Sequence, residues 1–177
     1  MTKFFNIIAL ALTLTACSTC YVNQQPVGKT FPQIVGEGLD KKEHQLPDYF
    51  SGRPVALLLG YKQESQFDID RWLIGLDMKQ VPVEVFELPS VLGWLPRQIK
   101  GTINEGMRKG IPDELWSIVI TVYKDSDKIQ AFTGNANPNN ARVILLNGQG
   151  QVSYFHDMGF SVKALNELTE TLRELQS

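Results

Sequence analysis

The residue types that most often carry protein chemistry are scarce in this chain. Cys17 and Cys20 both lie near its start, and no thiol follows position 20. The rest of the chain therefore offers no disulfide, no thiolate nucleophile and no cysteine ligand for a metal. His44 falls in a polar turn, and His156 precedes Asp157. Neighbours on a strand point to opposite faces, so we expect His156 and Asp157 to form no general-base pair. With so few reactive side chains, we also expect no catalytic residue, no metal site and no cofactor.

The first cysteine closes an apolar run that is typical of an export signal. Lys3 supplies a positive charge, residues 4–14 are apolar except for two positions, and Leu14-Thr15-Ala16-Cys17 ends the run. A secretory signal has an apolar middle of about 7–15 residues, whereas a membrane-spanning helix needs about 20. The last four residues resemble the lipobox of bacterial lipoproteins, whose cysteine receives a diacylglycerol. We expect residues 1–16 to be removed and Cys17 to become an acylated first residue.

Charge and sorting signals indicate where such a protein would act. Lys and Arg number 17 against 19 Asp and Glu, a net charge of −2. Nucleic-acid binding usually requires a basic stripe, so we expect no nucleic-acid partner, and membrane contact through the acyl chains of Cys17 alone. Ser18 stands where an aspartate would resemble an inner-membrane retention signal. We therefore expect an anchor in the bacterial cell envelope, in the outer membrane facing the periplasm.

The remaining chain is interpreted as a tether followed by one domain. Residues 17–29 contain the lipidated cysteine and a polar stretch with Pro26, which lacks apolar periodicity and predicts a flexible tether. Residues 30–177 show no internal repeat and no later linker. A chain of this length can bury roughly 70% of its unfolded surface.

Turn signals divide this domain into alternating strands and helices. The continuous apolar run 55–60 predicts a central strand buried on both faces. The turn 147–150 predicts a hairpin, and leucines spaced by three or four after Ser161 predict a capped final helix. The other expected strands are 31–35, a piece ending at Leu46 after a turn at 36–38, 81–87, 117–123, 128–133, 143–146 and 152–155; the other expected helices are 66–79, capped by Ser65, and 94–109.

This order of elements resembles the thioredoxin fold. Phe31-Pro32, Leu46-Pro47 and Gly52-Arg53-Pro54 are similar to the amino-terminal part of redoxin-type proteins, and 143–150 is similar to their last strand and turn. The resemblance implies an α/β fold, a thioredoxin-like three-layer sandwich with a mixed central sheet and an N-terminal β extension. The same proline and glycine motifs, with Trp72, resemble the mitochondrial ATP-synthase assembly factor family, whose redoxin-like relatives need not be thiol enzymes.

The chain departs from the redoxins at their active site. Redoxins place reactive cysteines just beyond the first core strand, at a helix amino terminus that lowers the thiol pKa. Counting from Val55, the matching positions hold Glu64-Ser65-Gln66-Phe67, which cannot exchange thiols. The family's cis-proline would fall near Ala141, and Pro138 is three residues early, so we expect no cis bond there.

These observations predict a binding or assembly module that is redox-inactive and not an enzyme. The expected protein-binding edge lies at the former active site and comprises Tyr61, Glu64, Ser65, Phe67, Asn139, Asn140 and Arg142. The alternative is an exported thiol-redox-linked or peroxidase-like enzyme that uses a partner's cysteines or an unrecognised cofactor. A basic helix face formed by Arg97, Lys100, Arg108 and Lys109 could bind an acidic partner, although a solvated face is the simpler interpretation.

Overall fold

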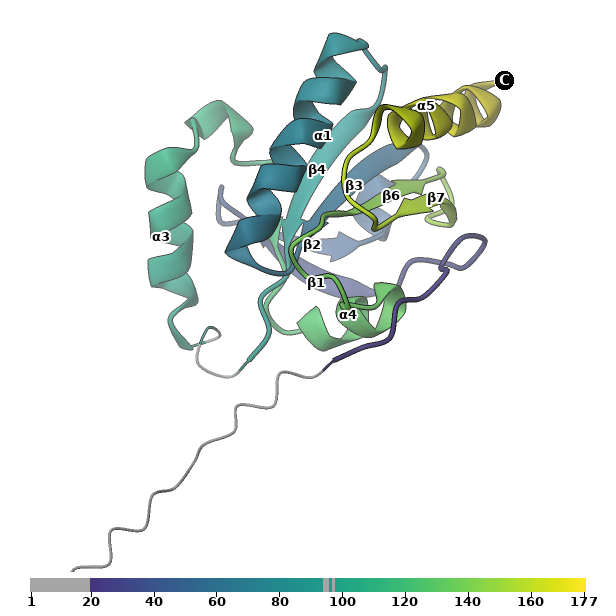
Figure 1. Ribbon diagram of the computed structural model, residues 1–177. Helices are drawn as coiled ribbons and strands as arrows, with labels where there is room; N and C mark the ends of the chain where they lie inside the picture. The colour runs from purple at the N-terminus through teal and green to yellow at the C-terminus, as the bar shows by residue number, and fades with distance from the viewer. Residues whose placement is uncertain (1–19, 94–95, 97) are drawn as a thin grey trace, which may run out of the picture.

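The computed structural model describes residues 20–93, 96 and 98–177, so the expected signal sequence and Cys17 lie outside the described residues. A four-stranded mixed sheet forms the centre of the domain, with strand order β4-β3-β6-β7 (Figure 1). Its strands are β3 (Val55–Gly60), β4 (Glu84–Pro89), β6 (Arg142–Leu146) and β7 (Val152–His156). β3 pairs in parallel with β4 and antiparallel with β6, and β6 pairs antiparallel with β7.

The predicted central strand and hairpin are confirmed. Residues 55–59 of β3 and the whole of β6 are buried, as expected of apolar strands covered on both faces. The β6–β7 turn is closed by Asn147, whose side-chain oxygen accepts hydrogen bonds from the backbone amides of Gln149 and Gln151. Gly150 has φ +73°, which favours glycine at this turn.

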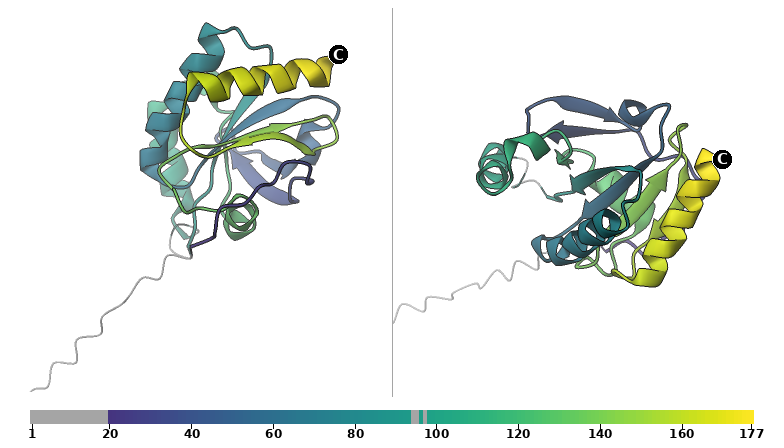
Figure 2. Two further views of the ribbon diagram at one scale, coloured as in Figure 1. Left: turned by 45° about the vertical axis from the view of Figure 1, so that its right-hand side comes forward. Right: turned by 90° about the horizontal axis from the view of Figure 1, so that it is seen from above.

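Two helices cover one face of the sheet (Figure 2). They are α1 (Gln66–Met78) and α5 (Val162–Gln176). The Ser161 side chain accepts a hydrogen bond from the amide of Ala164, which confirms the predicted cap of α5. Trp72 of α1 and Leu168 of α5 lie in one buried cluster with the strand residue Leu58.

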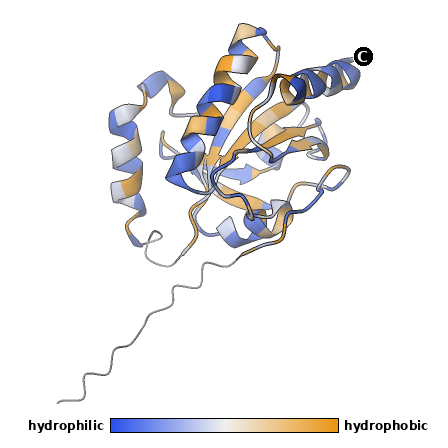
Figure 3. Cartoon of the chain, in the orientation of Figure 1, coloured by the Kyte–Doolittle hydropathy of each residue, from blue (hydrophilic) through white to orange (hydrophobic). Residues whose placement is uncertain are grey.

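A second, smaller sheet and a helix cover the opposite face (Figure 2). This sheet has the order β2-β1-β5 and consists of β1 (Ile34–Gly38), β2 (Glu43–Leu46) and β5 (Ile120–Thr121). With α4 (Ser126–Thr133), it buries a second cluster that includes Ile34, Leu57 and Ile129. Figure 3 shows apolar residues concentrated on the central strands. The result is the expected three-layer α/β arrangement with an N-terminal β extension.

A helix at the side of the molecule, α3 (Lys100–Gly110), stands beside α1 (Figure 1). Among its residues only Asn104 is buried. Short 3-10 turns occur at Asp48–Phe50, Gln63–Ser65 and Asp113–Leu115. None of the helices in the described part of the chain has the length and apolar character required to cross a bilayer.

Several expected elements differ from the structure. Residues 128–133 belong to α4 and not to a strand, because Ile129 and Thr133 are buried one helical turn apart. Residues 36–38, expected to be a turn, end β1, since Glu37 pairs with Glu43. Of the expected strand 117–123, only β5 and two isolated bridges, at Val119 and Val122, are formed. The helix expected to begin at residue 94 is continuous from Lys100 among the described residues.

The described part of the expected tether lies against the domain. The Gln24 amide donates to the carbonyl of Thr133, and the Gly28 amide donates to that of Val152. The Asn23 side chain donates to Asp157. These hydrogen bonds, together with the burial of Pro26, hold the segment against the domain.

Candidate functional site

A groove of about 800 Å³ opens beside the start of α1. One side is formed by residues 60–67 with Ile69 and Asp70, which follow β3 and begin α1. Residues 89–91, which end β4 and follow it, line a second part. The other side comes from α3 through Ile103, Gly106 and Met107. Tyr61, Glu64, Ser65 and Phe67 of the expected edge therefore line one groove.

The turn into α1 depends on Gly60 and Ser65. A Cβ atom at Gly60 would lie 2.7 Å from Ser65 Oγ, so only glycine permits this close approach. Ser65 Oγ donates a 2.6 Å hydrogen bond to the carbonyl of Lys62. Ser65 is consequently buried and closes the turn. Ser65 occupies the N-cap position of α1, but its side chain makes no capping hydrogen bond, so the expected side-chain cap is wrong; its hydroxyl is used by this turn.

Large apolar side chains line the groove without covering one another. Phe67, at the start of α1, is 73% exposed. Ile103 and Met107 of α3 are only half-buried. Apolar surface that gathers in a concave site is typical of a binding surface, because its transfer from water favours association.

The groove also contains an unsatisfied polar group. Ser90 is 1% exposed, and its backbone amide donates to the carbonyl of Gly60 over 2.8 Å. Its hydroxyl, however, has no hydrogen-bond partner. A buried hydroxyl without a partner is costly, so a ligand group that reaches it from the groove would relieve that cost.

Carboxylates dominate the charge at the α1 end of the groove. Gln66 donates hydrogen bonds to Asp70 over 2.9 Å and to Glu87 over 3.3 Å. Burial raises the pKa of Glu87, the hydrogen bond from Gln66 opposes this, and the charge of Asp70 raises it further. Glu64 is exposed nearby, and Lys62 is the cation in the lining. Among the described residues, none of these carboxylates forms an ion pair.

Arg142 joins the groove to the neighbouring loop. Its guanidinium lies 4.9 Å from the ring centroid of Tyr61, and Nη1 donates to the carbonyls of Asn137 and Asn140. The side chain is fully buried, and burial lowers the pKa of Arg142. Arg142 was expected on a binding edge. In the structure it lies behind Tyr61 and holds the loop in place, because its nearest acceptors are backbone carbonyls.

The loop residues of the expected edge lie beyond this contact. Asn139 is exposed, whereas the side-chain Nδ2 of Asn140 donates to the carbonyl of Asp157 over 3.0 Å. The Tyr61 hydroxyl is hydrogen-bonded to Thr133, and burial raises the pKa of Tyr61. The expected edge is thus two adjoining parts, a groove and an amide-bearing loop, joined by the contact between Tyr61 and Arg142.

Asp68 has a role that the sequence pattern did not reveal. Its buried carboxylate accepts hydrogen bonds from the backbone amides of Ala141, over 2.9 Å, and Phe160, over 2.7 Å. Ala141 was the position expected for the redoxin proline, and a proline has no amide hydrogen to donate. The cis peptide bond in the described chain precedes Pro47, and Pro138 lies in the loop held by Arg142.

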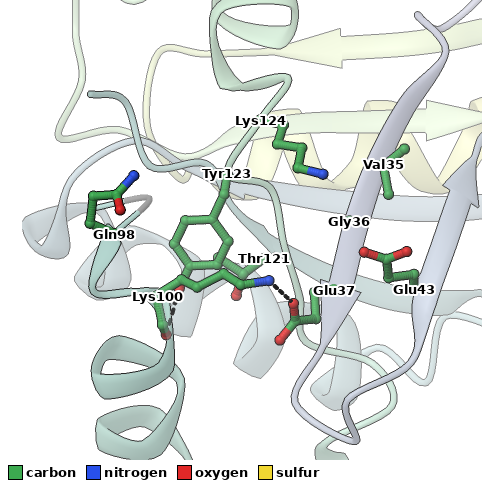
Figure 4. A pocket seen from close by; sticks show the side chains of 9 residues that line it. All are labelled: Val35, Gly36, Glu37, Glu43, Gln98, Lys100, Thr121, Tyr123 and Lys124. Carbon is green, nitrogen blue, oxygen red and sulfur yellow. Dashed lines mark hydrogen bonds and ion pairs between the residues drawn. The ribbon is translucent and has the colours of Figure 1, made fainter. Parts of the chain in front are cut away.

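Polar contacts fix α3 to the smaller sheet. Lys100 Nζ lies 2.7 Å from Glu37 Oε2 (Figure 4). Asn104 donates to Glu37 Oε1 over 3.0 Å. Arg108 donates to the carbonyl of Leu39 over 2.6 Å. Two cations of the expected basic face are therefore occupied within the domain, while Arg97 lies outside the described residues. Because α3 is held by polar atoms, its apolar side chains remain at the groove.

Comparisons with known proteins support the fold. No protein-family model and no curated protein matches the chain. Among solved structures, a SCO1/SenC family lipoprotein from Bacillus anthracis is 9% identical, with a TM-score of 0.58, over 88% of this chain and 100% of that chain. The exposed lipoprotein thioredoxin of Streptococcus pneumoniae is 13% identical, with a TM-score of 0.53, over 78% of this chain and 98% of that chain.

A thiol peroxidase from Chromobacterium violaceum is 11% identical, with a TM-score of 0.54, over 89% of this chain and 92% of that chain. Likeness at these identities establishes architecture and not activity. The chain has a thioredoxin-like fold, which confirms the prediction from the sequence.

Proposed function

We propose that this protein is a redox-inactive, lipid-anchored thioredoxin-like module that binds a protein partner in the groove between α1 and α3. The observation that carries the proposal is the groove itself. It combines exposed Phe67, in the segment 64–67 that counting from Val55 matches to the redoxin cysteines, with half-buried Met107 and the unpartnered hydroxyl of Ser90. The groove therefore offers surface for association where related folds offer thiol chemistry.

A role without redox chemistry follows from the residues at the former active site. Glu64, Ser65, Gln66 and Phe67 carry no thiol, and Ser65 is committed to the turn before α1. Cys20 is exposed and does not line the groove. The chain's own groove residues can position and bind, but they cannot exchange a disulfide.

The chemistry of the groove favours a partner segment that is both apolar and basic. A large apolar side chain would cover Phe67 and Met107, removing apolar surface from water. A lysine or arginine of the partner would neutralise Asp70 and Glu87, which Gln66 holds together. Asn139 and Asn140 on the adjoining loop supply further hydrogen-bonding groups at the edge.

The anchoring part of the proposal rests on the sequence from Lys3 to Cys17. Cleavage before Cys17 and acylation of its thiol would display the domain in the cell envelope, at the outer membrane and facing the periplasm. Cys17→Ser should leave an uncleaved precursor that takes up no labelled fatty acid in cells. Labelling of this variant at the level of the unaltered protein would contradict the assignment of Cys17.

Crosslinking in cells tests the groove. A Phe67→Ser and Met107→Ser variant should remain folded and anchored but lose most of the crosslinked partner, since both changes remove apolar contact area at the groove. The matched control is Ile74→Ser with Met78→Ser. These residues are 59% and 80% exposed on α1, the helix that carries Phe67, and lie outside the groove. The control should retain its crosslinks.

Reversing one charge in the groove tests whether the partner is basic as well as apolar. Asp70→Lys should weaken capture, while Asp77→Lys, a change at the far end of α1, should not. Equal crosslinking by the groove variant and its control would place the interface elsewhere. Insulin reduction or peroxide consumption that survives Cys20→Ser would instead favour the enzyme alternative.

A further inference from the structure

A second cavity, of about 290 Å³, lies between α3 and the smaller sheet (Figure 4). Figure 4 shows side chains from the sheet and from α3 meeting around it. The charged and polar residues in its lining are Glu37, Glu43, Gln98, Lys100, Thr121, Tyr123 and Lys124. Water occupies about 30 Å³ per molecule, so the cavity has room for a ligand of about ten non-hydrogen atoms.

Three of these residues form a row across one face of the smaller sheet. Glu37 of β1 lies directly opposite Glu43 of β2 and, on its other side, opposite Thr121 of β5. Like charges directly opposite each other destabilise an antiparallel pair. Lys100 neutralises Glu37, whereas the exposed side chain of Glu43 forms no ion pair or hydrogen bond with any described residue. The row therefore contains one carboxylate that lacks a cationic partner.

The third member of the row is an unsatisfied hydroxyl. Thr121 is fully buried, yet its Oγ1 has no hydrogen-bond partner. Most buried side-chain hydroxyls in proteins are hydrogen-bonded, so an unpaired hydroxyl in the wall of a cavity is available to hydrogen-bond a ligand. Lys100 adds hydrogen-bonding capacity, because its ammonium group has three N–H donors and one of them is directed at Glu37.

The lining excludes most simple ligand classes. A pure anion would be repelled by Glu37 and Glu43, and a pure cation would be repelled by Lys100 and Lys124. An uncharged apolar molecule would leave the Thr121 hydroxyl unsatisfied. A small molecule that carries both charges complements the lining.

We propose that this cavity binds a small zwitterion of the α-amino acid class, with its ammonium group at Glu43 and its carboxylate at Lys100 and the Thr121 hydroxyl. The site is separate from the groove proposed above. No residue lines both cavities, and α3 contributes Lys100 to this one but Ile103 and Met107 to the groove.

Calorimetric titration of the full-length protein in detergent tests the proposal, with each standard α-amino acid as the probe. We expect at least one of them to bind. Its N-acetyl derivative and its methyl ester, which each lack one charge, should bind about 10- to 100-fold more weakly, as expected for a lost charged hydrogen bond.

Two variants assign the contacts. Glu43→Gln should weaken binding of the zwitterion about 10- to 100-fold but leave binding of the N-acetyl derivative unchanged, because that derivative has no ammonium group. Thr121→Val should also weaken binding, with no loss of thermal stability, since the removed hydroxyl has no partner in the unliganded protein. Glu114→Gln, a change at an exposed carboxylate outside the cavity, is the control. Absence of binding by every amino acid, or equal affinities in both variants and the control, would overturn the proposal.

Discussion

Helices α5 and α3 carry similar apolar spacing in the sequence but attach to the domain in different ways. In α5, Leu165, Leu168 and Leu172 are buried in the cluster against the central sheet. In α3, the corresponding apolar residues Ile103 and Met107 are half-buried and line the groove. Polar contacts to the smaller sheet hold α3 instead.

The apolar surface of α5 therefore stabilises the fold, whereas that of α3 is available for binding. Burial of the α5 side chains removes them from water within the folded chain, so they contribute to its stability. The apolar surface of α3 is only partly removed from water, and the remainder can be buried by a partner. The two helices should therefore respond differently to the same kind of substitution.

The largest stability effect is expected in α5. Leu168 is fully buried at the centre of its apolar face. Leu168→Ala should lower the free energy of unfolding by about 2–5 kcal/mol, through lost burial and a residual cavity. Urea denaturation followed by circular dichroism measures this change. If Leu168→Ala lowered the free energy of unfolding by less than Ile103→Ala does, the proposed difference between the two helices would be wrong.

A polar substitution should have the next largest effect, and it should be confined to α3. The buried Asn104 side chain joins Glu37 to the hydroxyl of Tyr123. Asn104→Ala should cost about 1–3 kcal/mol, the usual range for breaking a buried hydrogen-bonded contact. Hydrogen exchange should accelerate in α3 while that of α5 stays unchanged. Asn166→Ala, at an exposed position of α5, serves as the control.

The smallest effect is expected at the groove. Phe67 is 73% exposed, so Phe67→Ala should change the free energy of unfolding by only about 0.5 kcal/mol. The same denaturation experiment measures it. A loss comparable to that of Leu168→Ala would mean that Phe67 is a core residue and not part of a binding surface.

Local sequence signals were sufficient for the parts of the fold that depend on strong apolar patterns. The run 55–60 became a central strand, and the turn at Asn147 became a hairpin. Ser161 caps α5 as expected. Each of these features follows from a short stretch of sequence whose pattern and turn residues favour the same structure.

The remaining features depend on contacts between distant parts of the chain. The β-prone segment 128–133 became helical because tertiary burial of Ile129 and Thr133 outweighed its weak local preference. Nothing in the pattern of α3 distinguishes an apolar face in the core from one at a groove. The burial of Arg142 behind Tyr61 and the unpartnered hydroxyl of Ser90 likewise arise only once β3, β4 and β6 are assembled.

Site-specific photo-crosslinking in cells tests the docking groove most directly. A photo-reactive residue is placed at Met107, in the groove, or at Asn166, on the exposed side of α5. We expect one dominant crosslinked protein from position 107, reduced by Asp70→Lys in the same chain, and no comparable product from position 166. The same product in equal yield from both positions, or a yield from position 107 that Asp70→Lys leaves unchanged, would contradict an apolar and acidic docking groove between α1 and α3.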